Sequence, residues 1–228
     1  MGLPKLNVPV YEAILPSTET VIKFRPFLVK EEKLLLTAME DGSHSAIMLS
    51  IKNIISNCVQ SEIDVDKLPL FDVEFLFLKF RAKSVGEVST IGLNCNKCEV
   101  TNQIELNMED IKVDKPEGHS KKIMIDDKIG VMMTYPVIST NGILEQDGMS
   151  IAKSCISMIF TGEETHERDS FTDKELDEFL ENMESKQFQK ISNFFDTMPR
   201  LRHNVNFNCV SCSKDNSLVL EGLDSFFG

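Results

Sequence analysis

Four of the six cysteines in this 228-residue chain come as two Cys-x-x-Cys pairs. The first pair, Cys95 and Cys98, lies within LNCNKCEVTNQIEL, and the second, Cys209 and Cys212, lies within FNCVSCSKDNSLVL. Thiolates at this spacing serve as metal ligands or as redox groups. The sequence that flanks each pair can distinguish metal binding from redox chemistry.

The two segments match each other beyond their cysteines. When Cys95 is aligned with Cys209, further pairs fall into register: Asn94 with Asn208, Asn102 with Asn216, Ile104 with Leu218, and Leu106 with Leu220. Each segment therefore predicts a β-hairpin that carries its Cys-x-x-Cys in the tight turn. Such a turn points two thiolates and nearby backbone N–H groups toward one ion.

Two turns of this kind supply four thiolates, which is the tetrahedral set that zinc prefers. We expect Cys95, Cys98, Cys209 and Cys212 to hold one structural Zn²⁺ per chain. Four thiolates leave no open position for water or substrate, so the site predicts architecture and not catalysis. The zinc would tie the middle of the chain to its end.

Three alternatives remain for these cysteines. All four can be free thiols, or each pair can be a redox dithiol, although neither pair has the βαβ setting of thioredoxin-like sites. His203, six residues before Cys209, can replace one thiolate as a ligand. The matched flanks favour the four-cysteine zinc site over these alternatives.

The remaining candidate residues predict no reaction. Cys58 and Cys155 fall on apolar helix faces, where a cysteine acts as a small buried hydrophobe. The carboxylate pairs Asp126-Asp127 and Glu163-Glu164 fall in polar turns, which collect such residues for solubility. We found no Ser/His/Asp set, glycine-rich phosphate loop or histidine metal signature, so the chain is not expected to be an enzyme.

The elements that position the cysteines belong to an α+β fold. It has small antiparallel strand hairpins, a zinc-ribbon-like pair of turns that together hold four cysteines, and a helical core of about five to six helices. Strand pairs are predicted over 8–28, 88–106, 121–138 and 200–220, and helices over 29–42, 44–59, 70–86, 143–160, 172–183 and 184–198. Thr172 and Glu175 form a capping box that starts one helix. The acidic stretch TGEETHERDS is predicted to be an exposed loop.

The cysteine spacing also suggests a domain organisation. Residues 1–90 are expected to form an N-terminal strand pair with helices. Residues 91–143 and 199–228 are expected to form the zinc-ribbon-like β module, and 144–198 a helical insert within it.

The charge and hydropathy of the chain indicate which classes of partner to expect. The formal net charge is −12, and the basic residues are dispersed, so a protein partner is expected and a nucleic-acid ligand is not. No apolar run is long enough for a membrane span. The N-terminus lacks a signal-peptide pattern, and Leu6 stands where a myristoylation signal prefers Ser or Thr. No small-molecule substrate is predicted.

Two stretches carry a resemblance to a known family. IKFRPFLVKEEKLLLTAME and GEVSTIGLNCNKCEV resemble the small baseplate hub subunits, also described as hub assembly catalysts or chaperones, of T-even-like contractile-tailed bacteriophages. The resemblance extends from about residue 8 to 222. It implies a non-enzymatic, late-expressed baseplate hub component or hub assembly chaperone, located in the virion tail baseplate or in the host cytoplasm during assembly. Its implied partners are other baseplate hub and tail proteins.

A second function remains open from the sequence. Zinc ribbons also occur in nucleic-acid or transcription accessory proteins, which present a basic face around the metal. Here Lys97 and Lys214 flank the cysteines, but Glu99 and Asp215 offset their charge. The apolar segments VPVYEAILP and GLDSFFG are candidate contacts for a protein partner, or else pack on the chain itself.

Overall fold

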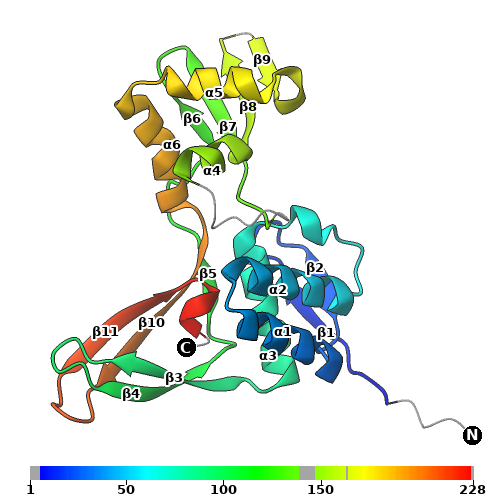
Figure 1. The fold of residues 1–228 in the computed structure, drawn as a ribbon, viewed down its shortest axis with the longest axis vertical. Coiled ribbons are helices and arrows are strands. Elements are labelled where there is room, and N and C mark those ends of the chain that lie inside the picture. The colour runs from blue at the N-terminus through cyan, green and yellow to red at the C-terminus, as the bar shows by residue number, and fades with distance from the viewer. Residues whose placement is uncertain (1–5, 139–146, 163, 227–228) are drawn as a thin grey trace, which may run out of the picture. The chain divides into compact units, whose positions relative to one another are not determined.

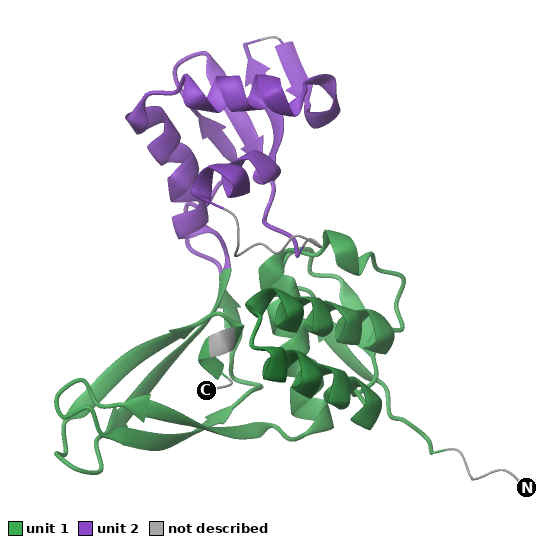
Figure 2. Ribbon diagram, viewed as in Figure 1, with its two compact units in different colours: residues 1–114, 200–228 green, residues 115–199 purple. Residues whose placement is uncertain are grey.

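A computed structural model describes residues 6–138, 147–162 and 164–226 (Figure 1). It divides into two compact units: residues 1–114 with 200–228, and residues 115–199 (Figure 2). Within the described residues there are six α-helices and four small antiparallel sheets, so the expected α+β class is confirmed. The three-part domain division expected from the sequence stays a prediction.

The helical part of the first unit packs around one central helix. Its elements are β1 (Tyr11–Ile14), β2 (Val21–Phe24), α1 (Val29–Asp41), α2 (His44–Cys58), the 3₁₀ turn η1 (Val65–Lys67) and α3 (Leu70–Ser84). Eight of the fifteen residues of α3 are buried, and the Phe80 ring stacks on Phe24 of β2 at 4.2 Å. At the start of α3, the fully buried Asp72 accepts hydrogen bonds from the backbone and hydroxyl of Ser17. The helix predicted over 70–86 is confirmed, and it ends at Ser84.

Two long hairpins complete the first unit. They are formed by β3 (Val88–Asn94) with β4 (Thr101–Asn107), and by β10 (Arg200–Asn208) with β11 (Asp215–Glu221); β5 (Lys112–Asp114) pairs with β10. Asn94 pairs with Thr101, and Asn208 pairs with Asp215 at the equivalent position. Both predicted hairpins are confirmed, with the same register.

The second unit is a four-stranded antiparallel sheet with three helices. Its elements are β6 (Lys122–Met124), β7 (Ile129–Met133), α4 (Gly148–Cys155), β8 (Ile156–Thr161), β9 (Glu164–Glu167), η2 (Arg168–Ser170), α5 (Asp173–Glu181) and α6 (Ser185–Thr197). Its core combines Val131 and Ile156 of the sheet with Leu176, Ile191 and Phe194 of the helices. The predicted capping box of Thr172 and Glu175 is present.

Two local predictions in this unit are wrong. The helix predicted over 143–160 ends at Cys155, and Ile156–Thr161 is a strand because it pairs between β7 and β9. Residues 143–146 lie outside the described residues. The predicted acidic loop contains β9, whose four polar, exposed residues hide the strand from a pattern search.

The ends of the chain differ in exposure. In the C-terminal GLDSFFG segment, Leu223 and Phe226 of the 3₁₀ turn η3 (Leu223–Phe226) are buried, so these two residues pack on the chain itself. In the N-terminal VPVYEAILP segment, Val10 and Ile14 are exposed, whereas Leu15 is buried. None of the helices in the described ranges has the length and apolarity needed to cross a membrane.

Candidate metal centre

The turns of the two long hairpins bring four thiols together. The Sγ atoms of Cys95 and Cys212 are 3.7 Å apart, and those of Cys98 and Cys209 are 3.5 Å apart. All four Sγ atoms lie within 4.8 Å of one another. Cysteines more than a hundred residues apart in sequence therefore form one cluster, where the turns of β3–β4 and β10–β11 meet (Figure 1).

The first turn is shaped by its own backbone. The N–H of Cys95 donates to the Val100 carbonyl at 3.0 Å, and the N–H of Glu99 donates to the Cys95 carbonyl at 2.9 Å. Glu99 adopts a left-handed φ of 60°, which closes the turn. The N–H of Lys97 points at the Cys95 Sγ from 3.4 Å. The thiol therefore faces a backbone donor that favours its ionised form.

The second turn repeats this geometry. Cys209 N–H donates to the Lys214 carbonyl and Ser213 N–H donates to the Cys209 carbonyl, both at 2.9 Å. Ser213 has a φ of 56°, and the N–H of Ser211 lies 3.4 Å from the Cys209 Sγ. When the two turns are aligned, Ser211 corresponds to Lys97 and Ser213 corresponds to Glu99. The structure thus bears out the duplicated hairpin inferred from the matched flanks.

Two buried asparagines clamp the turns onto each other. Asn102 of β4 accepts a hydrogen bond from Val210 N–H in the second turn at 2.8 Å. Asn216 of β11 accepts one from Asn96 N–H in the first turn at 2.9 Å. Each side chain also donates to a carbonyl of its own turn, at Val100 and Lys214 respectively.

The same asparagines reach the thiols. The Nδ2 of Asn216 lies 3.5 Å from the Cys95 Sγ, and that of Asn102 lies 3.9 Å from the Cys209 Sγ. Sulfur accepts weakly as a thiol and more strongly as a thiolate. The amides therefore form an outer layer that orients the cysteines of the facing turn.

The electrostatics of the cluster favour thiolates at its two buried positions. Backbone donors at Lys97 and Cys98 lower the pKa of Cys95 to about 6. The backbone N–H of Cys212 is the main cause of a lowered pKa at Cys209. Cys95 and Cys209 are buried, whereas Cys98 and Cys212 are half-buried. The backbone N–H of Val100 lowers the pKa of Cys98, but burial and hydrogen bonds with the neighbouring thiols outweigh it and raise that pKa to about 12. The lowered pKa values thus favour thiolates at Cys95 and Cys209.

The sulfur spacing fits a tetrahedral ion. Four Zn–S bonds of about 2.3 Å at tetrahedral angles separate neighbouring sulfurs by about 3.8 Å. The Cys95–Cys212 and Cys98–Cys209 sulfurs, 3.7 and 3.5 Å apart, lie near that value and far above a disulfide bond length of about 2.05 Å. The four cysteines can therefore bind a metal ion with a closed coordination shell.

The other sequence candidates lie elsewhere. His203 sits in β10 opposite Leu220 and is not part of the four-thiol cluster. Cys58 and Cys155 are buried, and burial raises the pKa of each thiol to about 11, which makes both unreactive. Asp126 and Asp127 follow β6 in an exposed turn, and Glu164 begins β9. Glu163 lies outside the described residues.

Asn102 and Asn216 are site residues to which the sequence analysis assigned no role. Their signal was present, since they occupy matching positions after their respective Cys-x-x-Cys pairs. Their reach into the opposite turn depends on how the hairpins meet, and that arrangement has no sequence pattern.

Comparison with known proteins relates the chain to a protein family. A family model described as T4 bacteriophage base plate protein matches residues 8–228 of the chain. No curated protein and no solved structure matches it significantly. The match covers both hairpins, all four clustered cysteines and the entire second unit.

Proposed function

The chain belongs to the T4 bacteriophage base plate protein family, and on that premise we propose that it is a non-enzymatic component or assembly chaperone of the baseplate hub. Its work would be done through contacts with other hub and tail proteins. The family match over residues 8–228 is the observation that carries this proposal. Membership in the family already places the protein among phage baseplate proteins, which act by association.

The metal centre would serve this role as a structural staple. We propose that Cys95, Cys98, Cys209 and Cys212 bind one Zn²⁺, because thiolates and tetrahedral spacing suit zinc. The ion would join the β3–β4 hairpin to the β10–β11 hairpin. One hairpin precedes the second unit in sequence and the other follows it. The ion would therefore link the segment before residues 115–199 to the segment after them.

Zinc would also neutralise the crowded sulfurs. Without a cation, only part of the cluster can ionise, because adjacent thiolates repel each other. A bound dication favours four thiolates, and backbone N–H donors would add to this at Cys95, Cys98 and Cys209. The bound metal would therefore add directly to the folding free energy of the first unit.

Association with hub proteins is tested by co-expression. The full chain, tagged, is expressed with each hub and tail protein of the same phage in turn, and complexes are separated by affinity capture and size exclusion. We expect a stable complex with at least one hub protein. A chain that stays solitary with every tail component contradicts the hub proposal.

The protein content of purified mature tails distinguishes a structural component from an assembly chaperone. A structural component remains in the finished tail at a fixed ratio to other baseplate proteins. An assembly chaperone is found in assembly intermediates and is absent from finished tails.

A further inference from the structure

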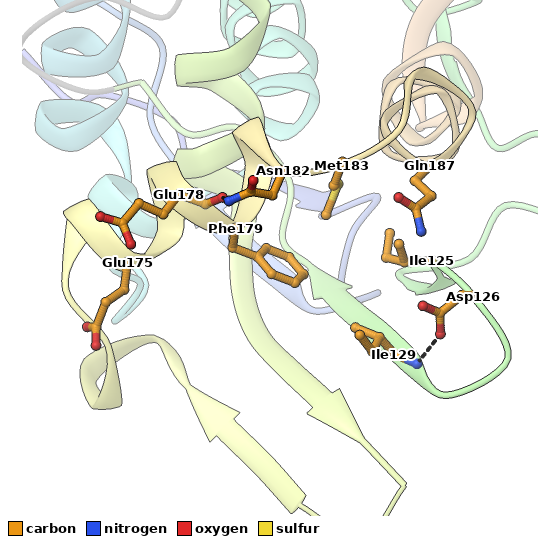
Figure 3. Close-up of a pocket in the computed structure, with 9 residues that line it drawn as sticks. All are labelled: Ile125, Asp126, Ile129, Glu175, Glu178, Phe179, Asn182, Met183 and Gln187. Carbon is orange, nitrogen blue, oxygen red and sulfur yellow. Dashed lines mark hydrogen bonds between the residues drawn. The ribbon is translucent and has the colours of Figure 1, made fainter.

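The second unit contains a pocket of about 410 Å³ that the metal centre does not involve. It lies between the turn that joins β6 to β7 and the helices α5 and α6 (Figure 3). Its volume falls in the range of sites that take a small ligand or a side chain of a partner.

The floor of the pocket is apolar. Ile125 is buried, and Ile129, Phe179 and Met183 are partly buried beside it. Figure 3 shows the Phe179 ring and the Met183 side chain converging on the two isoleucines. Ile125 belongs to the core of this unit, with Phe179 and Met183 packed against it, so the floor is a fixed surface. An apolar side chain placed there would leave water on entry.

The rim of the pocket is acidic. Asp126, Glu175 and Glu178 line it, and none of its nine lining residues is basic. In Figure 3, Asp126 lies on one side of the Phe179 ring and the two glutamates lie on the other. Negative charge therefore flanks the apolar floor at both ends. The helix α5 extends this field, since five of its nine residues are Asp or Glu.

Two of these carboxylates are fixed by backbone donors. Asp126 Oδ1 accepts from the N–H groups of Ile129 and Lys128, at 2.7 and 2.8 Å, which lowers the pKa of Asp126. Glu175 accepts from the N–H and hydroxyl of Thr172, which lowers the pKa of Glu175. Both carboxylates are therefore charged at neutral pH, and their positions are set by the fold.

Lys190 and Lys128 are the cations that act on Asp126, and neither of them lines the pocket. Lys190 of α6 lies on the Ile125 side, and its Nζ donates to the carbonyls of Met124 and Ile125 at 3.1 and 2.8 Å. Glu178 is exposed, and its ion pair with Lys174 is a loose contact of 3.8 Å. The Glu178 carboxylate is thus available to a ligand from outside.

We propose that this pocket docks a protein segment in which one apolar side chain is flanked on both sides by Lys or Arg. The apolar side chain would occupy the floor of Ile125, Ile129, Phe179 and Met183. The flanking cations would face Asp126 at one end and Glu175 with Glu178 at the other. The inference rests on the proposed function only in taking the partner to be a tail protein.

A peptide selection tests the pocket without any tail protein, so its failure is separate from failure of the hub proposal. Random heptapeptides displayed on phage are selected on the immobilised full-length protein and counter-selected on Glu178→Lys. Enriched peptides should carry Leu, Met, Ile or Phe with Lys or Arg within two positions on each side. Their affinity should fall as salt is raised, because the rim is exposed.

Matched variants locate the binding. Glu178→Lys and Glu181→Lys reverse one exposed charge on the same helix, but Glu181 does not line the pocket. By fluorescence anisotropy, Glu178→Lys should weaken the best peptide by at least about tenfold, and Glu181→Lys by less than about threefold. Replacing the peptide's apolar residue with Ala should also weaken it by at least about tenfold. Glu178→Gln, with an intermediate loss, replaces Glu178→Lys if that variant melts early.

Four outcomes would overturn the proposal. They are failure to enrich any peptide, enrichment of acidic peptides, equal weakening by the two charge reversals, or binding of tetralysine as tight as that of the selected peptide. The last two would mean that the unit attracts cations over its whole surface and has no apolar docking site.

Discussion

Asn102 of the first hairpin accepts a 2.8 Å hydrogen bond from the backbone N–H of Val210, in the turn of the second hairpin. A mirrored bond joins Asn216 to Asn96. Two turns that are far apart in sequence are therefore held together by protein groups as well as by any metal. This distinction can be measured, because the asparagines and the cysteines can be changed separately.

Removal of one asparagine should loosen the cluster without removing a ligand. Asn102→Ala leaves the Val210 N–H without its partner, so we expect a loss of about 1–3 kcal/mol in unfolding free energy. Zinc affinity should fall about tenfold or more, since outer-layer groups orient the ligands. Urea unfolding and competition with a chromophoric chelator measure the two effects.

Asn206→Ala is the control for this change. Asn206 is an exposed residue of β10 in the same hairpin, and its replacement should alter stability by no more than about 0.5 kcal/mol. Equal effects of the two substitutions would remove the clamping role of Asn102.

Metal removal should act on one unit only. All four cysteines lie in the first unit, so chelation should expose the amides near the turns of β3–β4 and β10–β11 to hydrogen exchange. The amides of β7 and β8 should keep their protection, because that sheet has its own core. Hydrogen-exchange mass spectrometry with and without chelator tests this pattern. Protection that is unchanged everywhere, or lost in both units alike, would contradict it.

Acid should weaken a buried ion pair in the first unit. Burial opposes ionisation of Glu31, but hydrogen bonds from Arg25 and from Leu28 N–H are together stronger and lower the pKa of Glu31. A lowered folded pKa stabilises the protein above the ordinary value of 4.5, and this stability is lost as pH falls through the folded value. Glu31→Gln should thus cost about 1.5–3 kcal/mol at neutral pH.

The pH series supplies the check. The difference between wild type and Glu31→Gln should shrink as pH falls from neutral to about 3, whereas Glu32→Gln should stay near wild type throughout. A difference that is constant or grows toward acid would show that the Glu31 charge is not stabilising.

A close approach in the second unit gives a packing test. A Cβ on Gly130 of β7 would lie 2.2 Å from the Phe160 ring of β8 and 3.0 Å from the Ile123 carbonyl. Gly130→Ala should therefore cost about 1–3 kcal/mol through overpacking. Phe160→Leu removes the ring, so the double variant should lose less than the sum of the single losses. Strict additivity, measured by thermal or urea unfolding, would refute the contact.

The sequence contained much of the metal centre. The matched positions around Cys95 and Cys209 predict both hairpins, their register and the meeting of four thiols. Local sequence signals also predicted two helices. The apolar run after Pro69 predicted α3, and the capping box at Thr172 predicted the start of α5. In each case the information lies within a short segment.

The failures concern contacts between distant segments. Ile156–Thr161 continues an apolar helical pattern, and only pairing with β7 and β9 makes it a strand. The pocket likewise combines Ile125 and Asp126 with Phe179, more than fifty residues away, so no local pattern marks it. Long-range pairing of this kind overrides local propensity.

Zinc content of the purified full-length protein tests the central claim most directly. Elemental analysis should give about one zinc per chain for the wild type and almost none for Cys95→Ser or Cys212→Ser, with a large loss of stability in both variants. Cys58→Ser, which changes a cysteine outside the cluster, should keep its zinc. A zinc-free wild type that is as stable as the Cys95→Ser variant would contradict the structural zinc site.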